Sequence, residues 1–172
     1  MFFSDEVSSH MDPARDDDLT AHSEYFPKIT PGLIVLIDLD RFKEYTVMKG
    51  LNPYIPNDVT GELTRLVEDF AIKYRGVVVY GLDYDRGTEE ALVEIPFGCE
   101  DVDSIIKDLE RLKNLINSYG VGVTIVVVHD YVSGMPASNR RDAYHATPGR
   151  KRAVKILNGL KKRGGNILYV EC

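Results

Sequence analysis

Apolar residues recur with two different periods along the chain, and each change of period predicts a new element. Five consecutive apolar residues at 33–37 lead into Asp38-Leu39-Asp40, a pattern typical of a buried central strand that ends in carboxylates. Residues 41–50 suggest a short helix, and residues 58–74 place their apolar side chains on one helical face. We therefore expect this part of the chain to form a strand followed by helices.

The same alternation continues to the end of the chain. The later elements are two strands, a helix, a strand, a basic helix and a last strand, at residues 77–82, 91–96, 101–119, 121–128, 150–163 and 166–170. A short polar segment between the first two of these strands predicts a hairpin. The order favours an α+β fold of the ferredoxin-like or polymerase-palm (nucleotidyl cyclase-like) type, with a βαββαβ core, an extra C-terminal helix and strand, and helices on one face of the sheet.

The domain boundary is predicted close to residue 32. Residues 1–31 are acidic and show no sustained period, so we expect a disordered N-terminal tail, in which Ser-Ser-His-Met at 8–11 resembles a cloning scar. Residues 32–172 form the single predicted domain, because a chain of 172 residues with 44% hydrophobic residues suits one core.

Charge and hydropathy narrow the class of protein. The net charge of -6 argues against a general nucleic-acid coat, so nucleic acid is not an expected partner. The sequence contains no apolar stretch long enough to span a bilayer and no basic-then-apolar leader. We therefore expect a cytoplasmic protein that does not bind a membrane.

Asp38 and Asp40 are the first candidates for chemistry. Two carboxylates one residue apart repel each other unless a cation or several amide donors compensate their charge. A divalent metal ion at the end of the strand would do so. The alternative interpretation is that the two side chains cap the helix that follows.

Three segments carry a resemblance to a known family. The segment 37–46, IDLDRFKEYT, resembles the first strand and turn of GGDEF-type diguanylate cyclases. The segment 87–96, GTEEALVEIP, is similar to a degenerate form of that family's signature hairpin, and 160–170, LKKRGGNILYV, is similar to its closing Ala-Lys-x-x-Gly-Arg-Asn segment. Archaeal GTP cyclohydrolase III, which the chain resembles at Tyr45-Thr46 and at 75–85, and the CRISPR polymerase palm domains are relatives with the same core.

The resemblance implies a metal-dependent site for a nucleoside triphosphate, GTP or ATP. It implies that Asp38 binds the metal and that Glu89 or Glu90 supplies a second carboxylate, while a second register of the resemblance makes Asp83 the metal-binding acid of the hairpin. Asp38, Asp83 and Glu90 are the implied catalytic residues. It implies that the nucleotide is contacted by Asp40, Arg41, Phe42, Lys43, Thr46, Lys161 and Asn166. Mg²⁺ or Mn²⁺ would neutralise the triphosphate, activate a ribose hydroxyl and stabilise the pyrophosphate leaving group, which is the chemistry of a nucleotidyl cyclase or cyclic nucleotide synthase.

The chain also departs from the family, and the departures keep other functions open. Thr46 stands where the family usually has an Asn that reads guanine, and Gly87-Thr88-Glu89-Glu90-Ala91 replaces the signature. A GTP cyclohydrolase III-like hydrolase is one alternative, and since that family uses two tandem palms, a homodimer would supply the second palm. The other alternative is a catalytically inactive module that senses a nucleotide or binds a protein.

The predicted hairpin suggests how its acids are arranged. A two-residue turn at Arg86-Gly87 would place Asp83 directly opposite Glu90 on the same face of the sheet. Two like charges in one rung are destabilising without a cation. The rung is therefore either a solvated tip or part of a metal site that Asp38 completes.

Basic residues concentrate in residues 139–163, where Asp142 is the only acid. Such a cluster in an acidic protein suggests a polyphosphate ligand or an acidic partner surface, and a solvated helix face is the alternative. Within this region we expect Lys161 to contact phosphate and Arg140 to lie in a mobile loop.

Overall fold

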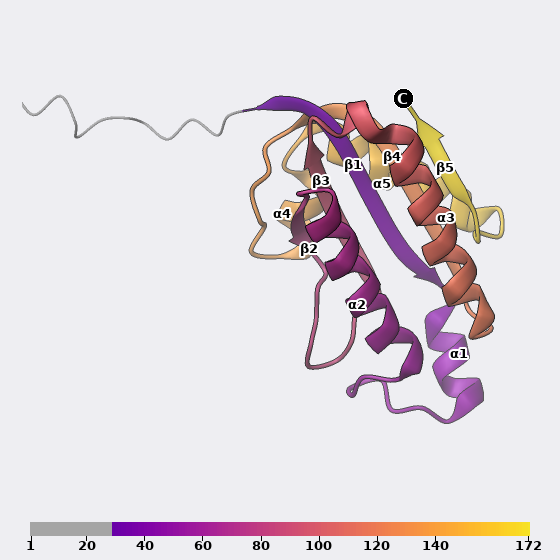
Figure 1. The fold of residues 1–172 in the computed structure, drawn as a ribbon. Coiled ribbons are helices and arrows are strands. Elements are labelled where there is room, and N and C mark those ends of the chain that lie inside the picture. Colours follow the sequence, from indigo (N-terminus) through magenta and orange to yellow (C-terminus); the bar gives the residue numbers. More distant parts are fainter. Residues whose placement is uncertain (1–28) are drawn as a thin grey trace, which may run out of the picture.

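Strand β1 (Thr30–Asp40) is the centre of the sheet in the computed structural model (Figure 1). It pairs antiparallel with β3 (Glu90–Pro96) on one side and with β4 (Gly122–Val132) on the other. Strand β2 (Val77–Tyr80) pairs antiparallel with β3, and β5 (Leu168–Glu171) pairs parallel with β4. The strand order is therefore β2-β3-β1-β4-β5 in a mixed sheet, and both the α+β class and the buried central strand are confirmed.

Five α-helices connect or flank these strands. They are α1 (Phe42–Lys49), α2 (Asp58–Lys73), α3 (Val102–Ser118), α4 (Arg140–His145) and α5 (Pro148–Lys162), with a 3-10 turn at Gly98–Asp101 before α3. Helix α5 begins two residues before its predicted start, because the Thr147 hydroxyl accepts a hydrogen bond from the Arg150 amide and Pro148 suits the first turn. Helix α4 is absent from the prediction, since six residues are too few to show a helical period.

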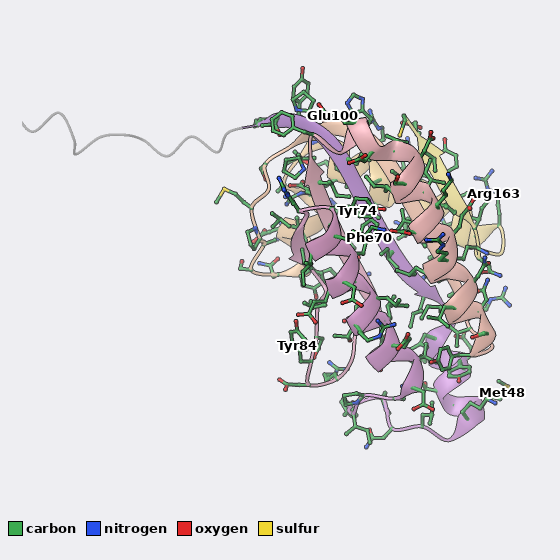
Figure 2. All side chains as sticks on the ribbon, viewed as in Figure 1. Met48, Phe70, Tyr74, Tyr84, Glu100 and Arg163 are labelled. Carbon is green, nitrogen blue, oxygen red and sulfur yellow. The ribbon has the colours of Figure 1, made fainter. Side chains whose placement is uncertain are left out.

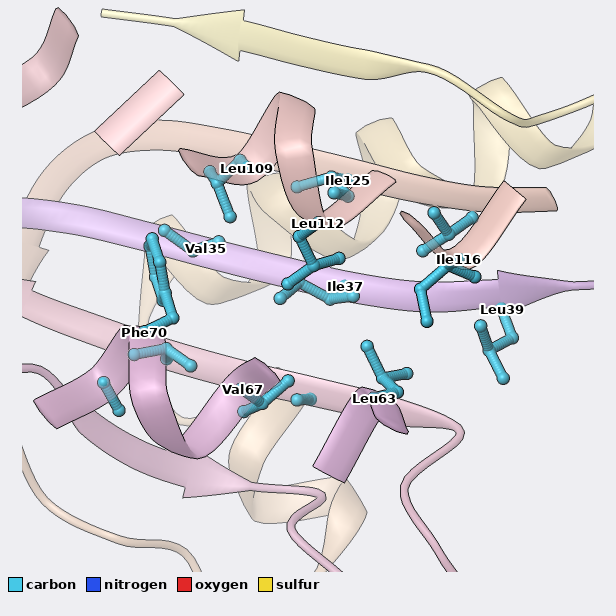
Figure 3. Close-up of a cluster of buried hydrophobic side chains, with 14 of the residues drawn as sticks. Val35, Ile37, Leu39, Leu63, Val67, Phe70, Leu109, Leu112, Ile116 and Ile125 are labelled. Atoms are coloured by element: carbon cyan, nitrogen blue, oxygen red, sulfur yellow. The ribbon is translucent and has the colours of Figure 1, made fainter. Parts of the chain in front are cut away.

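Helices α2 and α3 pack on the same face of the sheet, as predicted. The odd-numbered apolar residues of β1, including Val35 and Ile37, point toward them. Figure 3 shows these side chains meeting Leu63 and Val67 of α2 and Leu109 of α3. The buried side chains on this face form the larger of the two apolar cores.

Helices α4 and α5 cover the opposite face of the sheet. Ile34 and Leu36 of β1 point to that side, where they pack with Tyr144 of α4 and with Ala153 and Leu157 of α5. The prediction of helices on one face therefore holds for α2 and α3 of the βαββαβ core, while α4 and the extra C-terminal helix α5 lie on the other face. The continuous apolar run in β1 has side chains directed to both faces, so each face needs its own cover.

The connection between β2 and β3 is a loop at 81–89, and the predicted two-residue turn is wrong. Strand β2 ends at Tyr80 after an irregularity in its pairing with β3. The loop docks on α2 through Thr88, whose amide donates to the Thr60 carbonyl at 3.2 Å and whose hydroxyl accepts from the Thr64 hydroxyl at 2.9 Å. Tyr84, on the same loop, lies on the surface (Figure 2). The pairing of β2 with β3 ends at Tyr80 and Leu92, and the Asp83 amide donates to the Thr88 hydroxyl at 3.2 Å, so no Asp83–Glu90 rung forms.

The structure describes residues 29–172. The predicted tail at 1–31 lies outside this range except for its last three residues, of which Thr30 and Pro31 belong to β1. No helix in the described part of the chain is long and apolar enough to cross a membrane.

Candidate functional site

Strand register brings two of the predicted acids face to face. Asp38 lies opposite Glu90 of β3 and, on its other side, opposite Thr124 of β4. The Leu39 amide donates to the Glu89 carbonyl at 2.9 Å, which makes Asp38 and Glu90 a pair without its own backbone hydrogen bonds. Side chains approach most closely in pairs of this kind. Glu90 therefore faces Asp38. The sequence analysis had instead placed Asp83 opposite Glu90.

A pocket of about 410 Å³ opens beside this pair of carboxylates. Its lining comes from the end of β1, the loop between β2 and β3, the start of β3, and α4: Asp38, Leu39, Tyr80, Gly81, Asp83, Arg86, Gly87, Glu89, Glu90 and Arg140. All four acids that the resemblance implied for metal binding are in this lining. The structure thus places the four acids around one cavity, although the predicted Asp83–Glu90 rung does not form.

Asp38 lies in surroundings that favour additional positive charge. Its side chain is 15% exposed, and Lys161 of α5 donates to its Oδ1 and, at 3.0 Å, to the Leu39 carbonyl. The pKa of Asp38 is raised to about 6, chiefly by burial and in part by the neighbouring charges of Glu90 and Asp40, while Lys161 opposes the rise. One ammonium group therefore compensates this carboxylate only in part.

Glu90 has two partners from α4. Arg140 Nε lies 2.8 Å from Glu90 Oε1, and Arg140 Nη2 donates to Oε2 at 2.8 Å. The hydroxyl of Tyr144 also donates to Oε2. Burial and this bond to Glu90 raise the pKa of Tyr144 well above its usual range, so the phenol stays protonated and acts as a donor.

The loop at 81–89 contributes five residues to the pocket lining. Asp83 Oδ1 accepts from the amides of Asp85 and Arg86, at 3.0 and 2.8 Å, so this carboxylate shapes the loop. Glu89 is exposed, and the Arg86 guanidinium lies 5.4 Å from the centre of the Tyr54 ring. A side chain at Gly81, whose φ is +106°, would approach the Glu90 carbonyl to 1.9 Å, so this close crossing requires glycine.

Asp40 contacts the turn before β5 and does not line the pocket. Its two carboxylate oxygens each lie 2.8 Å from the Thr124 hydroxyl, and Oδ2 accepts from the Asn166 amide at 2.6 Å. Lys161 Nζ is 3.8 Å away from Asp40 Oδ1. Residue Arg41 takes the capping position of α1 without a side-chain hydrogen bond, so the interpretation of Asp38 and Asp40 as helix caps is wrong.

The other residues implied to contact nucleotide follow Asp40 at the start of α1. Arg41 has a left-handed backbone, with φ of 49°, and Lys43 is exposed. Phe42 is buried and stacks on Tyr45, with 5.7 Å between ring centres. Thr46 is buried too, and its hydroxyl donates to the Lys43 carbonyl at 2.8 Å. The side chains of Phe42 and Thr46 therefore contribute to packing and are not in the pocket lining.

Arg140 and Tyr144 are the site residues that the sequence analysis missed. Arg140 was expected in a mobile loop, but it lies in the first turn of α4 and contacts Glu90, so that expectation is wrong. The one local signal is Asn139, whose side chain caps α4 by accepting from the Asp142 amide. Nothing in the sequence pairs α4 with Glu90, which lies 50 residues before Arg140.

Across residues 29–172, no three His, Cys, Asp or Glu side chains are grouped so that they could hold a metal ion by themselves. The Asp38 and Glu90 oxygens are instead turned to Lys161 and Arg140. Comparison of the sequence with protein-family models and with curated proteins finds no match. The site is therefore interpreted from its own geometry.

Proposed function

We propose that this pocket binds GTP or ATP together with Mg²⁺ or Mn²⁺, and that the chain is a nucleotidyl cyclase or cyclic nucleotide synthase with a palm-type domain. The observation that carries the proposal is the facing pair Asp38 and Glu90 at the edge of a polar cavity, with Lys161 beside it. Two carboxylates from the protein are enough for Mg²⁺ when substrate phosphates supply further oxygens.

The sheet topology supports the palm part of the proposal. Strands β2, β3, β1 and β4 are neighbours in that order, and each adjacent pair is antiparallel. This is the arrangement that a βαββαβ chain requires when its two halves interleave. Helices α2 and α3 on one face are also what this layout needs.

Each site residue has a separate role in the proposed reaction. Asp38 and Glu90 would hold the cation, which when bound supplies charge neutralisation and activation of the attacking hydroxyl. Lys161 donates to Asp38 and has a flexible stem, so its ammonium could turn to a phosphate if Asp38 held the cation. The Tyr144 hydroxyl orients Glu90.

An inactive nucleotide-sensing or protein-binding module is the second candidate. One observation favours it: both Glu90 oxygens already have partners on α4, so the carboxylate is not free for a metal ion. A GTP cyclohydrolase III-like hydrolase would use the same pocket and would differ from the cyclase in its product.

The test is to incubate the protein with each of the four nucleoside triphosphates and Mg²⁺ or Mn²⁺, and to identify the products by mass. A cyclic or linked nucleotide with release of pyrophosphate is expected, and Asp38→Asn should abolish it. The matched control is Asp69→Asn, which changes an exposed acid on α2 that pairs with Arg65 and is not in the pocket lining. Nucleotide binding without turnover would favour the inactive module, and a ring-opened base would favour the hydrolase.

A further inference from the structure

Both carboxylate oxygens of Glu90 have partners on α4. The guanidinium of Arg140 binds both of its oxygens, at 2.8 Å each, and the Tyr144 hydroxyl binds one of them. A metal ion coordinates a carboxylate through the same lone pairs, so it cannot bind Glu90 fully while this guanidinium is in place. Arg140 therefore takes the place of a cation at this carboxylate.

The two partners of Glu90 differ in how freely they can leave it. The Arg140 side chain is 60% exposed and lines the pocket, so it can rotate away without disturbing the core. Tyr144 is buried, and its ring packs edge-on against Tyr80 with 6.4 Å between the ring centres. If Arg140 left, Glu90 would keep one oriented hydrogen bond while its other lone pairs became available.

The charges of the pocket suggest that a triphosphate would bind the guanidinium of Arg140 after it leaves Glu90. Four carboxylates line the cavity, against the guanidinium groups of Arg86 and Arg140 and the nearby ammonium of Lys161. A triphosphate without a metal ion would meet excess negative charge, and a metal ion without a triphosphate would compete with Arg140. A guanidinium that binds a carboxylate through two parallel bonds binds a phosphate in the same way.

The absence of an all-protein metal cage in residues 29–172 agrees with this charge balance. Mg²⁺ in nucleotide sites commonly uses one or two carboxylates and completes its coordination with phosphate oxygens and water. Such an ion binds well only when the triphosphate accompanies it. The pocket therefore suits the metal–nucleotide complex better than either component alone.

We propose that Arg140 is an exchange residue of this site, and the proposal rests on the function proposed above. In the nucleotide-free protein Arg140 neutralises Glu90 and excludes a divalent cation. When a metal–nucleotide complex enters, Arg140 leaves Glu90 to the metal and binds the triphosphate. One residue thereby couples the binding of metal to the binding of nucleotide.

The experiment measures metal and nucleotide affinity separately in Arg140→Gln. Mn²⁺ alone is titrated by electron paramagnetic resonance of the free ion, and Mg²⁺–ATP and Mg²⁺–GTP by calorimetry. Removing the guanidinium should raise the affinity for Mn²⁺ alone by about tenfold and lower that for the metal–nucleotide complex by about tenfold, the size of one charge-assisted contact. Arg140→Lys, which keeps the charge without the two parallel bonds, should lie between the wild type and Arg140→Gln.

Arg152→Gln is the matched control. Arg152 of α5 is also partly exposed and pairs with two carboxylates, those of Asp130 and Glu171, outside the pocket lining. It should change neither affinity. Circular dichroism of all variants checks that they are folded.

Opposite changes in the two affinities support the proposal, and several outcomes would overturn it. An unchanged or weaker affinity for Mn²⁺ in Arg140→Gln shows that Arg140 does not compete with a cation. A higher affinity for Mn²⁺ with unchanged nucleotide affinity removes the phosphate contact. If the wild-type protein binds no nucleotide, the proposed function and the phosphate contact fail together, while the Mn²⁺ titration still decides the competition at Glu90.

Discussion

Two Glu–Arg ion pairs lie on the same face of β3, four residues apart, in very different surroundings. Glu94 and Arg150 are sealed in the protein, with side chains 0% and 3% exposed, whereas Glu90 and Arg140 are 19% and 60% exposed. The buried pair joins β3 to α5, and the open pair joins β3 to α4 at the pocket. The chemistry of the two pairs is the same, so their surroundings decide what each can do.

The buried pair is completed by the loop that follows β4. Glu94 Oε2 accepts from the amides of Gly134 and Ser133, at 2.8 and 3.2 Å, while Oε1 binds Arg150 Nε at 2.7 Å. Arg150 also donates to the Ser133 hydroxyl and to the Met135 carbonyl. If either charge were removed, the other would remain buried without a counterion, so this pair has a structural role. The open pair can exchange partners because water or a ligand can replace either side.

The largest expected effect is on the buried pair. Arg150→Met should lower the free energy of unfolding by about 3–5 kcal/mol, because Glu94 is left buried without a counterion. Arg140→Met at the open pair should change it by about 1 kcal/mol or less. Urea denaturation of both variants measures the difference, and equal losses would contradict the distinction between the pairs. If Arg150→Met does not fold, Glu94→Leu combined with Arg150→Met should recover most of the lost stability.

The Asp38–Lys161 pair lies between these extremes and should give the next largest effect. Since the pKa of Asp38 rises from 3.8 to about 6 on folding, the fold favours the protonated acid. Its contribution to stability is therefore greatest below about pH 4 and is lost as the pH rises through 6, a change of about 3 kcal/mol.

Asp38→Asn removes this pH dependence, because the amide does not titrate. Unfolding by urea from pH 4 to pH 8 without divalent cations should show the variant gaining stability relative to the wild type as the pH rises. Asp69→Asn, at an exposed position of α2, should follow the wild-type curve. Parallel curves for Asp38→Asn and the wild type would show that folding does not raise the pKa of Asp38.

The smallest expected effect is that of Lys161, which pairs with Asp38, on nucleotide affinity. Lys161→Gln should weaken binding of the Mg²⁺–nucleotide complex by about tenfold, the loss of one charge-assisted hydrogen bond. Lys155→Gln, at an exposed position of the same helix, removes the same charge and should leave the affinity nearly unchanged. Titration at two salt concentrations separates the cases, because equal losses that vanish at high salt would indicate a general electrostatic field.

Local sequence determined much of this protein. The apolar run of β1, the helical periods of α2 and α3 and the later strands are visible in the chain, because side-chain period reports how each segment is buried. The position of Asp38 at a strand end and the concentration of acids before β3 follow from the sequence as well. So does the presence of Lys161 near the end of a basic helix.

Only the tertiary structure decided which of these groups meet. The pairing of β2 with β3 ends before Asp83 could face Glu90, and the register of β1 with β3 placed Glu90 opposite Asp38. Helix α4 was too short to be seen in the sequence, yet it supplies both partners of Glu90. Register and docking depend on contacts between residues distant in the chain, and period carries no information on those contacts. Hence the sequence indicated the acids that line the pocket, and the packing of α4 brought the Arg140 guanidinium to one of them, Glu90.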